Sequence, residues 1–251
     1  MQTVRVKREK EFFIKQNIFY RYDILKSLAV SSNGQWQSIE RQWDKIRKKL
    51  FILREKRLHP GKDYKILTDW NGLMIAALAK AGHILEEKEY IRMASRTADF
   101  IFNKMIIDRH CLYHRYRDED ANIMGFLDDY AFLIWGLLEL HKATSQSTYL
   151  QKALVLNNKL MEDFWDRENG GFYFTSASAE ILPIRMKEVY DGAIPSGNSV
   201  ALSNLLKLAR LTGDLKFFNH ATKIEKAFSS LIQKNPTAYA FFLAGIDSLE
   251  R

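Results

Sequence analysis

The sequence predicts an all-α protein in which helix hairpins repeat and are arranged as an α/α toroid. Strongly apolar helical stretches alternate with amphipathic ones along residues 61–251. This pair occurs three times, and a long connector follows the second helix each time. Connectors that all lie at one end of stacked hairpins bring their polar residues together on a rigid scaffold. An ordinary α-solenoid with a protein-binding face is the alternative that the same repeat allows.

Residues 1–60 are expected to form a basic N-terminal arm and a first helix. They carry 15 Lys and Arg against 6 Asp and Glu, whereas residues 61–251 carry 23 against 24. The basic charge therefore does not extend over the folded domain, which argues against nucleic acid as a partner. A helix over Gln35–Arg54 is predicted from apolar residues spaced by three and four, namely Trp36, Ile39, Trp43, Ile46, Leu50 and Phe51.

Composition limits the class of protein. The chain has 251 residues, 47% of them hydrophobic, which is enough for one substantial core. No apolar run reaches the roughly 18 residues of a membrane span, so we expect no membrane partner. Cys111 is the single cysteine, which excludes a disulfide within the chain and favours a reducing, cytoplasmic location.

The first hairpin follows a polar and aromatic cluster at Lys65–Gly72. Its inner helix, from about Trp70 to Ala81, is apolar on nearly every face, so we expect it to be buried on all sides. Its outer helix begins near Glu87. A short strand is predicted at Cys111–Arg117.

The second inner helix starts within Gly125–Phe132, and the third starts within Ile194–Leu202. Alternating aromatic residues after Asn169-Gly170-Gly171 predict a turn and a strand over Phe164–Thr175, and Ile181–Gly192 is the expected returning strand. Residues Ala238–Ile246 resemble the opening of a fourth inner helix. The repeat of about 60–70 residues is too long for tetratricopeptide or ankyrin units of roughly 33–34.

Four segments resemble the thioredoxin-domain-containing family that includes spermatogenesis-associated protein 20. They occur in the same order and cover more than half of the chain: REKRLHPGKDYKILTDWNGLMIAALA, GFLDDYAF, FWDRENGGFYFT and KEVYDGAIPSGNSVALSNLLKL. The resemblance implies an (α/α)6 toroid of the six-hairpin glycosidase type, similar to sugar epimerases and glycoside hydrolases. In that family the toroid follows a thioredoxin-like domain.

The sequence departs from this pattern in three ways. The thioredoxin-like domain is absent, Tyr64 replaces an acidic residue, and the chain ends in its fourth hairpin. We therefore expect an incomplete (α/α)6 toroid with short β-hairpin inserts, truncated at the C-terminus. A thioredoxin-like protein on another chain, or self-association through the truncated end, are the expected protein partners.

The candidate catalytic residues are three carboxylates. Asp128 and Asp129 begin the second inner helix, where the helix dipole favours the charged form and suits a general base. Asp129 is the candidate that faces the ligand, and Asp128 is the candidate helix cap. Asp191, on the connector into the third inner helix, would supply the second carboxylate that glycoside hydrolysis requires.

Several neighbouring residues are of types that bind sugars. Trp70, Asn71 and Tyr130 offer an aromatic face, an amide and a phenol, although core packing explains Trp70 equally well. Lys65 and Arg185 could bind an anionic group or form salt bridges. Glu188, Ser196 and Asn198 complete the set, and Ser196 is equally well explained as a helix cap. A saccharide is therefore the expected ligand.

The histidines are interpreted as structural. His83 and His141 fall at the far ends of inner helices, which argues against the sugar 2-epimerases that use histidines in the cleft. His110 and His114 flank the predicted strand beside Cys111, but no further ligand follows at a suitable spacing. We expect no metal and no cofactor. The leading function is carbohydrate processing or binding, and the alternative is a non-catalytic domain that works with a separate thioredoxin-like partner.

Overall fold

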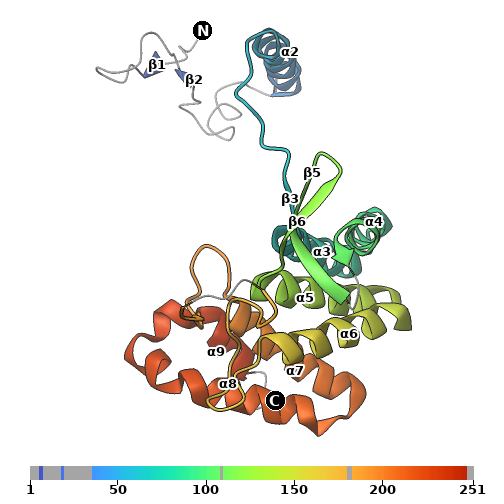
Figure 1. The fold of residues 1–251 in the computed structure, drawn as a ribbon. Helices are drawn as coiled ribbons and strands as arrows, with labels where there is room; N and C mark the ends of the chain where they lie inside the picture. The colour runs from blue at the N-terminus through green and yellow to red at the C-terminus, as the bar shows by residue number, and fades with distance from the viewer. Residues whose placement is uncertain (1–5, 8–17, 20–35, 108–109, 180–182, 248–251) are drawn as a thin grey trace. The chain divides into compact units, whose positions relative to one another are not determined.

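The computed structural model describes residues 6–7, 18–19, 36–107, 110–179 and 183–247 (Figure 1). The chain divides into two compact units, residues 1–63 and residues 64–251, and each is considered by itself. Among the described residues, no helix is both long enough and apolar enough to cross a membrane.

The described residues of the first unit include one long helix. α2 spans Trp36–Glu55, which confirms the helix predicted over Gln35–Arg54, although the side chains of Trp36 and Ile39 lie outside the described part. On α2, Ile46, Leu50 and Leu53 are 46–57% exposed. The unit also contains a two-residue pairing of β1 (Val6–Lys7) with β2 (Ile18–Phe19).

The second unit consists of three helix hairpins and the start of a fourth. The hairpins are α3 (Thr68–Ile84) with α4 (Lys88–Lys104), α5 (Leu127–Thr144) with α6 (Ser147–Asp163), and α7 (Gly197–Thr212) with α8 (Leu215–Lys234). A 3-10 turn, η2 (Pro236–Tyr239), leads into α9 (Ala240–Asp247). The predicted hairpin order is therefore confirmed.

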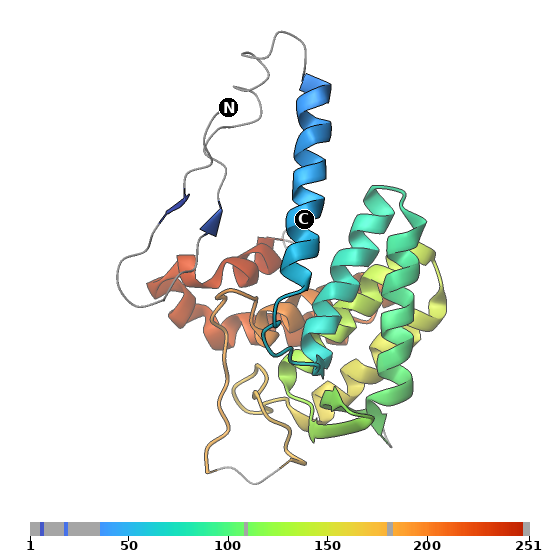
Figure 2. The same cartoon turned by 90° about the horizontal axis from the view of Figure 1, so that it is seen from above.

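The inner helices form a row with α5 between α3 and α7, and α9 packs on α7 (Figure 2). Twelve residues of α5 are buried because it has helices on several sides. Glycine allows α3 and α5 to approach closely, since a Cβ on Gly72 would lie 2.6 Å from the backbone of Phe132 and Leu133. α4, α6 and α8 each pack against their own hairpin partner.

One expectation about α3 is wrong. Trp70 is 63% exposed and Met74 is 54% exposed, so this helix is not buried on all sides. Ala77 is exposed on the same stripe. Among the described elements, α4 and α5 are the helices that pack on α3, and neither covers this exposed stripe. Hydrophobicity alone does not reveal which side of a helix has a neighbour.

A small antiparallel sheet lies beside the first hairpin. β5 (Cys111–Arg117) pairs with β3 (Ile66–Leu67), β4 (Ile106–Ile107) and β6 (Asp120–Met124). The predicted strand at Cys111–Arg117 is confirmed. The strand predicted within Phe164–Thr175 is reduced to a single bridge between Trp165 and Phe172. The described part of the expected returning strand, residues 183–192, contains no strand.

Candidate functional site

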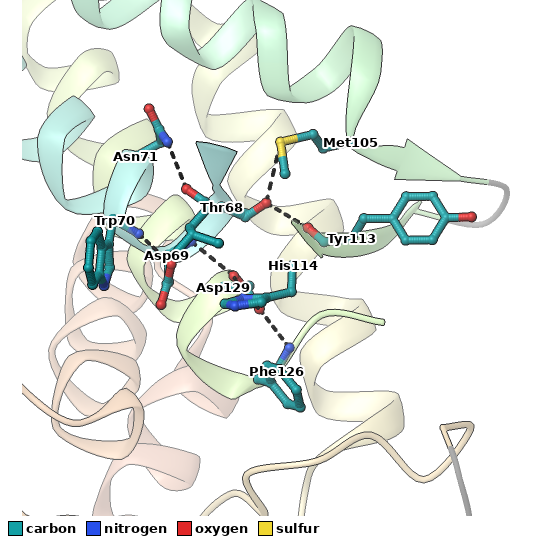
Figure 3. Close-up of polar contacts among 10 residues, drawn as sticks. Thr68, Asp69, Trp70, Asn71, Met105, Tyr113, His114, Phe126 and Asp129 are labelled. Atoms are coloured by element: carbon teal, nitrogen blue, oxygen red, sulfur yellow. Dashed lines mark hydrogen bonds and ion pairs between the residues drawn. The ribbon is translucent and has the colours of Figure 1, made fainter. Parts of the chain in front are cut away.

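The site is built where the first turns of α3 and α5 meet strand β5 (Figure 3). The start of α7 packs against the start of α5, and we call this whole region the mouth. Thr68 begins α3 and ties it to β5, because its Oγ1 donates a hydrogen bond of 2.6 Å to the carbonyl oxygen of Tyr113. This bond holds strand β5, and therefore His114, against the start of α3.

Asp129 is fully buried and joins two helices. Its Oδ2 accepts a hydrogen bond of 2.8 Å from the backbone N–H of Phe126, the N-cap residue of α5. Its Oδ1 accepts one of 2.9 Å from the backbone N–H of Asp69 in the first turn of α3. The carboxylate thus satisfies donors that both helix starts would otherwise leave unpaired.

The expected roles of the two adjacent aspartates are therefore reversed. Asp129 is the cap, and Asp128 is the half-buried residue. Successive helix positions point about 100° apart, so only one of the two could reach back to the N-cap backbone. The sequence did not indicate which one would do so.

His114 completes a dyad with Asp129. Its Nδ1 lies 3.0 Å and 3.1 Å from the two carboxylate oxygens of Asp129. The hydrogen bond to Asp129 is the largest cause of a raised His114 pKa, and burial opposes it. The His114 side chain is 21% exposed, and among the described residues its Nε2 has no hydrogen-bond partner. An edge contact with Phe126, at 5.2 Å between ring centroids, helps to fix the imidazole.

Asp128 has the most strongly perturbed carboxyl group of the mouth. Burial raises its pKa to about 7, and the charges of Asp129, Asp69 and Glu188 act in the same direction. The backbone N–H of Gly197 opposes the shift. The helix dipole favours the charged form, but burial and like charge outweigh it here.

Gly197 lets α7 approach Asp128. A Cβ at this position would lie 2.3 Å from Oδ1 of Asp128 and 2.6 Å from Cγ of Leu127. A side chain here would therefore displace α7 or the carboxylate. Close contact between α7 and α5 is what buries Asp128.

Asp69 is the third carboxylate of the cluster and is only 9% exposed. Its pKa is raised, first by burial and then by the charge of Asp129. Oxygen and nitrogen atoms of Asp69, His114 and Asp129 lie within 4.8 Å of one another. This set could hold a cation, but both oxygens of Asp129 already accept hydrogen bonds from backbone N–H groups and from His114. We therefore interpret the set as a hydrogen-bonded cluster.

Asp191, expected as the second catalytic carboxylate, joins the N-cap of α7 to the start of α9. Its Oδ1 accepts a hydrogen bond of 2.9 Å from the backbone N–H of Ser196. Its Oδ2 accepts bonds of 2.9 Å and 3.0 Å from the backbone N–H groups of Phe241 and Phe242. Because both oxygens are engaged by backbone donors, the geometry supports a structural role.

Tyr130 and Asn198 are core residues. Tyr130 is 2% exposed, and its hydroxyl oxygen accepts a hydrogen bond from the backbone N–H of Leu112. Burial raises the pKa of this phenol. Asn198 is fully buried and binds the backbone of Phe172 and the carbonyl oxygen of Glu188. Neither side chain is open to a ligand.

Two further candidates also hold the fold together. Ser196 is the N-cap of α7 and accepts a hydrogen bond from the backbone N–H of Ser199, which matches the capping alternative. Arg185 donates hydrogen bonds to the carbonyl oxygens of Thr175 and Asp163 and lies over the ring of Tyr173.

The remaining candidates lie at or near the mouth. Trp70 is exposed beside Asp69, and Asn71 donates a hydrogen bond of 2.7 Å to the carbonyl oxygen of Leu67. Lys65 and Glu188 are exposed. Glu188 acts electrostatically on Asp128, which places it among the charges of the mouth.

A cavity of about 160 Å³ lies farther along α7, against α9, and Ser203, Lys207 and Phe241 are among its lining residues.

The sequence analysis interpreted His114 as structural and did not name Asp69, a member of the polar cluster at Lys65–Gly72, as a catalytic or binding residue. Strand alternation could have pointed to His114, because position 114 lies on the same face of β5 as Leu112, which is fully buried. No sequence spacing could reveal the cluster itself, since its three members come from α3, β5 and α5.

Comparison with solved structures defines the class of fold: the chain folds as part of an (α/α)6 toroid. It aligns with cellobiose 2-epimerase from Bacillus thermoamylovorans at a TM-score of 0.57 and 16% identity, covering 68% of this chain and 46% of that one. It aligns with the GH76 α-mannanase BT2949 of Bacteroides thetaiotaomicron at a TM-score of 0.56 and 14% identity, covering 82% of this chain and 58% of that one. It aligns with the unsaturated glucuronyl hydrolase of Bacillus sp. GL1 at a TM-score of 0.53 and 18% identity, covering 69% of this chain and 49% of that one.

Sequence comparison identifies homologues more specifically. The chain is 34% identical over 200 residues to human spermatogenesis-associated protein 20, covering 76% of this chain and 25% of that protein. It is 32% identical over 203 residues to an uncharacterized protein of Caenorhabditis elegans, covering 78% of this chain and 27% of that protein. No protein-family model matches the chain. The chain thus spans about a quarter of the length of these relatives.

Proposed function

We propose that the mouth binds a saccharide and transfers protons to and from it, with Asp128 as the base and His114 as the acid. The observation that carries this proposal is the arrangement around Asp129. Asp129 holds the imidazole of His114 on one side, and its charge raises the pKa of Asp128 on the other. Catalytic acids and bases need pKa values close to the working pH.

The signs of the two shifts decide the assignment of roles. Asp128 loses its proton near pH 7, so above that pH it is an ionised base in a poorly solvated position. The pKa of His114 is raised, first by its hydrogen bond to Asp129, and this favours the protonated imidazole that a general acid requires. Activity should rise with pH through about 7 and fall once His114 deprotonates.

Three further observations support a saccharide as the substrate. The solved neighbours with this toroid fold include an epimerase and two glycoside hydrolases. Trp70 presents an exposed indole beside Asp69, and a flat apolar face suits a pyranose ring. Asp128, Asp69 and His114 supply donors and acceptors for hydroxyl groups. The described residues contain no comparable observation that favours a non-catalytic partner of a thioredoxin-like protein.

The test combines ligand binding with turnover. Calorimetric melts of the full chain with a panel of mono- and disaccharides should show one sugar class that raises the melting temperature with concentration. Asp128→Asn should then abolish turnover of that sugar while the variant stays folded. A chain that no sugar stabilises, or an Asp128→Asn variant with full turnover, would overturn the proposal.

A further inference from the structure

Carboxylates dominate the electrostatics of the mouth. The charged groups that act most strongly on Asp128 are all acidic, namely Asp129, Asp69 and Glu188. The imidazole of His114 is the counter-charge among the groups that act most strongly on Asp69. Among the described groups that act most strongly on Asp69 and Asp128, His114 is therefore the one cation beside several carboxylates, so the site favours a further positive charge.

The nearby basic side chains with a recorded partner are engaged by other acids. Arg115, the residue after His114, lies 3.3 Å from Asp120. Lys187, the residue before Glu188, lies 2.7 Å from Asp166. Both cations therefore serve pairs outside the cluster, and neither appears among the strongest influences on Asp69 or Asp128.

Asp69 is the carboxylate best placed to receive a cation. Nine-tenths of the residue is buried, and its Oδ1 accepts a hydrogen bond of 2.7 Å from the backbone N–H of Trp70. Its Oδ2 accepts no hydrogen bond from the residues that the structure describes. Figure 3 shows the carboxylate between the indole of Trp70 on one side and the His114–Asp129 dyad on the other.

Trp70 adds a second group that attracts positive charge. Its indole is the side chain with the strongest cation–π attraction, and it is 63% exposed immediately beside Asp69. A partly buried carboxylate next to an exposed indole is a combination that recognises an ammonium group. Neutral hydroxyl groups gain much less from it, and a uronate carboxylate would be repelled.

We propose that the mouth selects saccharides that carry a free, protonated amine, with the ammonium group placed between Asp69 and Trp70. This inference rests on the proposed function and deepens it by naming the substrate class. The amine relieves the repulsion among Asp69, Asp128 and Asp129. The pyranose ring then lies on the indole, within reach of Asp128 and His114.

The test uses matched pairs of sugars, so that it does not depend on the identity of one ring. Glucosamine, galactosamine and mannosamine are each titrated into the full chain beside their N-acetyl forms, and glucuronate serves as the anionic probe. At least one amine should bind roughly tenfold more tightly than its acetylated form, and glucuronate should bind most weakly. The preference should shrink as salt screens the charges.

Asp69→Asn is the diagnostic variant, because the amide can still accept the hydrogen bond from Trp70. It should reduce the amine preference, measured as the ratio of the two dissociation constants, several-fold. Asp118→Asn, on the exposed β5–β6 turn, is the matched loss of one acidic charge and should leave the preference unchanged.

The possible outcomes separate this inference from the proposed function. Equal binding of amine and N-acetyl sugars, or tighter binding of glucuronate, would overturn the amine preference and leave saccharide binding intact. A preference that survives in Asp69→Asn would overturn the assigned position of the ammonium group. If none of the sugars binds, both proposals fail.

Discussion

Asp129 and Asp191 perform the same capping task in two regions of the molecule, yet only one of them belongs to a candidate site. Each accepts hydrogen bonds from two or more backbone N–H groups at the start of a helix. Asp129 also holds an imidazole and lies beside two more carboxylates, whereas the recorded partners of Asp191 are backbone groups. The capping bonds alone therefore do not indicate function, and the titratable neighbours make the difference.

The largest expected effect comes from removing the buried cap. Asp129→Ala should lower the free energy of unfolding by about 3–5 kcal/mol, because it leaves the N–H groups of Asp69 and Phe126 and the His114 ring without their acceptor. Urea denaturation measures this loss. A loss below about 1 kcal/mol would show that Asp129 does not join the two helix starts.

Asp191→Ala should cost about 2 kcal/mol, less than Asp129→Ala, because Asp191 is half-buried whereas Asp129 is fully buried. The same denaturation experiment measures it, and hydrogen exchange should quicken at Phe241 and Phe242. If Asp191→Ala proves more destabilising than Asp129→Ala, the conclusion that Asp129 is the more important cap is wrong.

Asp128→Asn should have a smaller effect of opposite sign, and the effect should depend on pH. The folded protein raises the pKa of Asp128 to about 7, so it binds a proton that the unfolded chain has already lost. The ionised carboxylate thus costs stability progressively as pH rises from about 4 to 7. The variant should gain about 1 kcal/mol over the wild type at pH 8 and little at pH 4. A destabilised variant at pH 8 would identify Asp128 as a cap.

The least perturbing experiment concerns His114 itself. The raised pKa of His114 depends first on its hydrogen bond to Asp129, so it should fall in Asp129→Asn and stay unchanged in Asp191→Asn. Titration of the ring proton resonances by NMR measures both. The stability that His114 contributes is complete below its unfolded pKa of about 6.5 and is lost as pH rises through the folded value. An equal shift in both variants would contradict the dyad.

Local patterns determined a large part of this structure. The order and approximate bounds of the three hairpins, the strand at Cys111–Arg117 and the helix over Gln35–Arg54 follow from apolar periodicity, which depends on residues only three or four positions apart. The toroid class follows from the repetition of these units, and comparison with solved structures confirms it.

Only the tertiary structure decided which side chains share the mouth. Whether Asp128 or Asp129 caps α5, and that His114 meets Asp129, depends on how α3, β5 and α5 pack across 60 residues of sequence. The exposed face of α3 likewise depends on which helices lie beside it. Such contacts are set by the relative placement of whole elements, and the pattern within a single helix or strand contains no information about that placement.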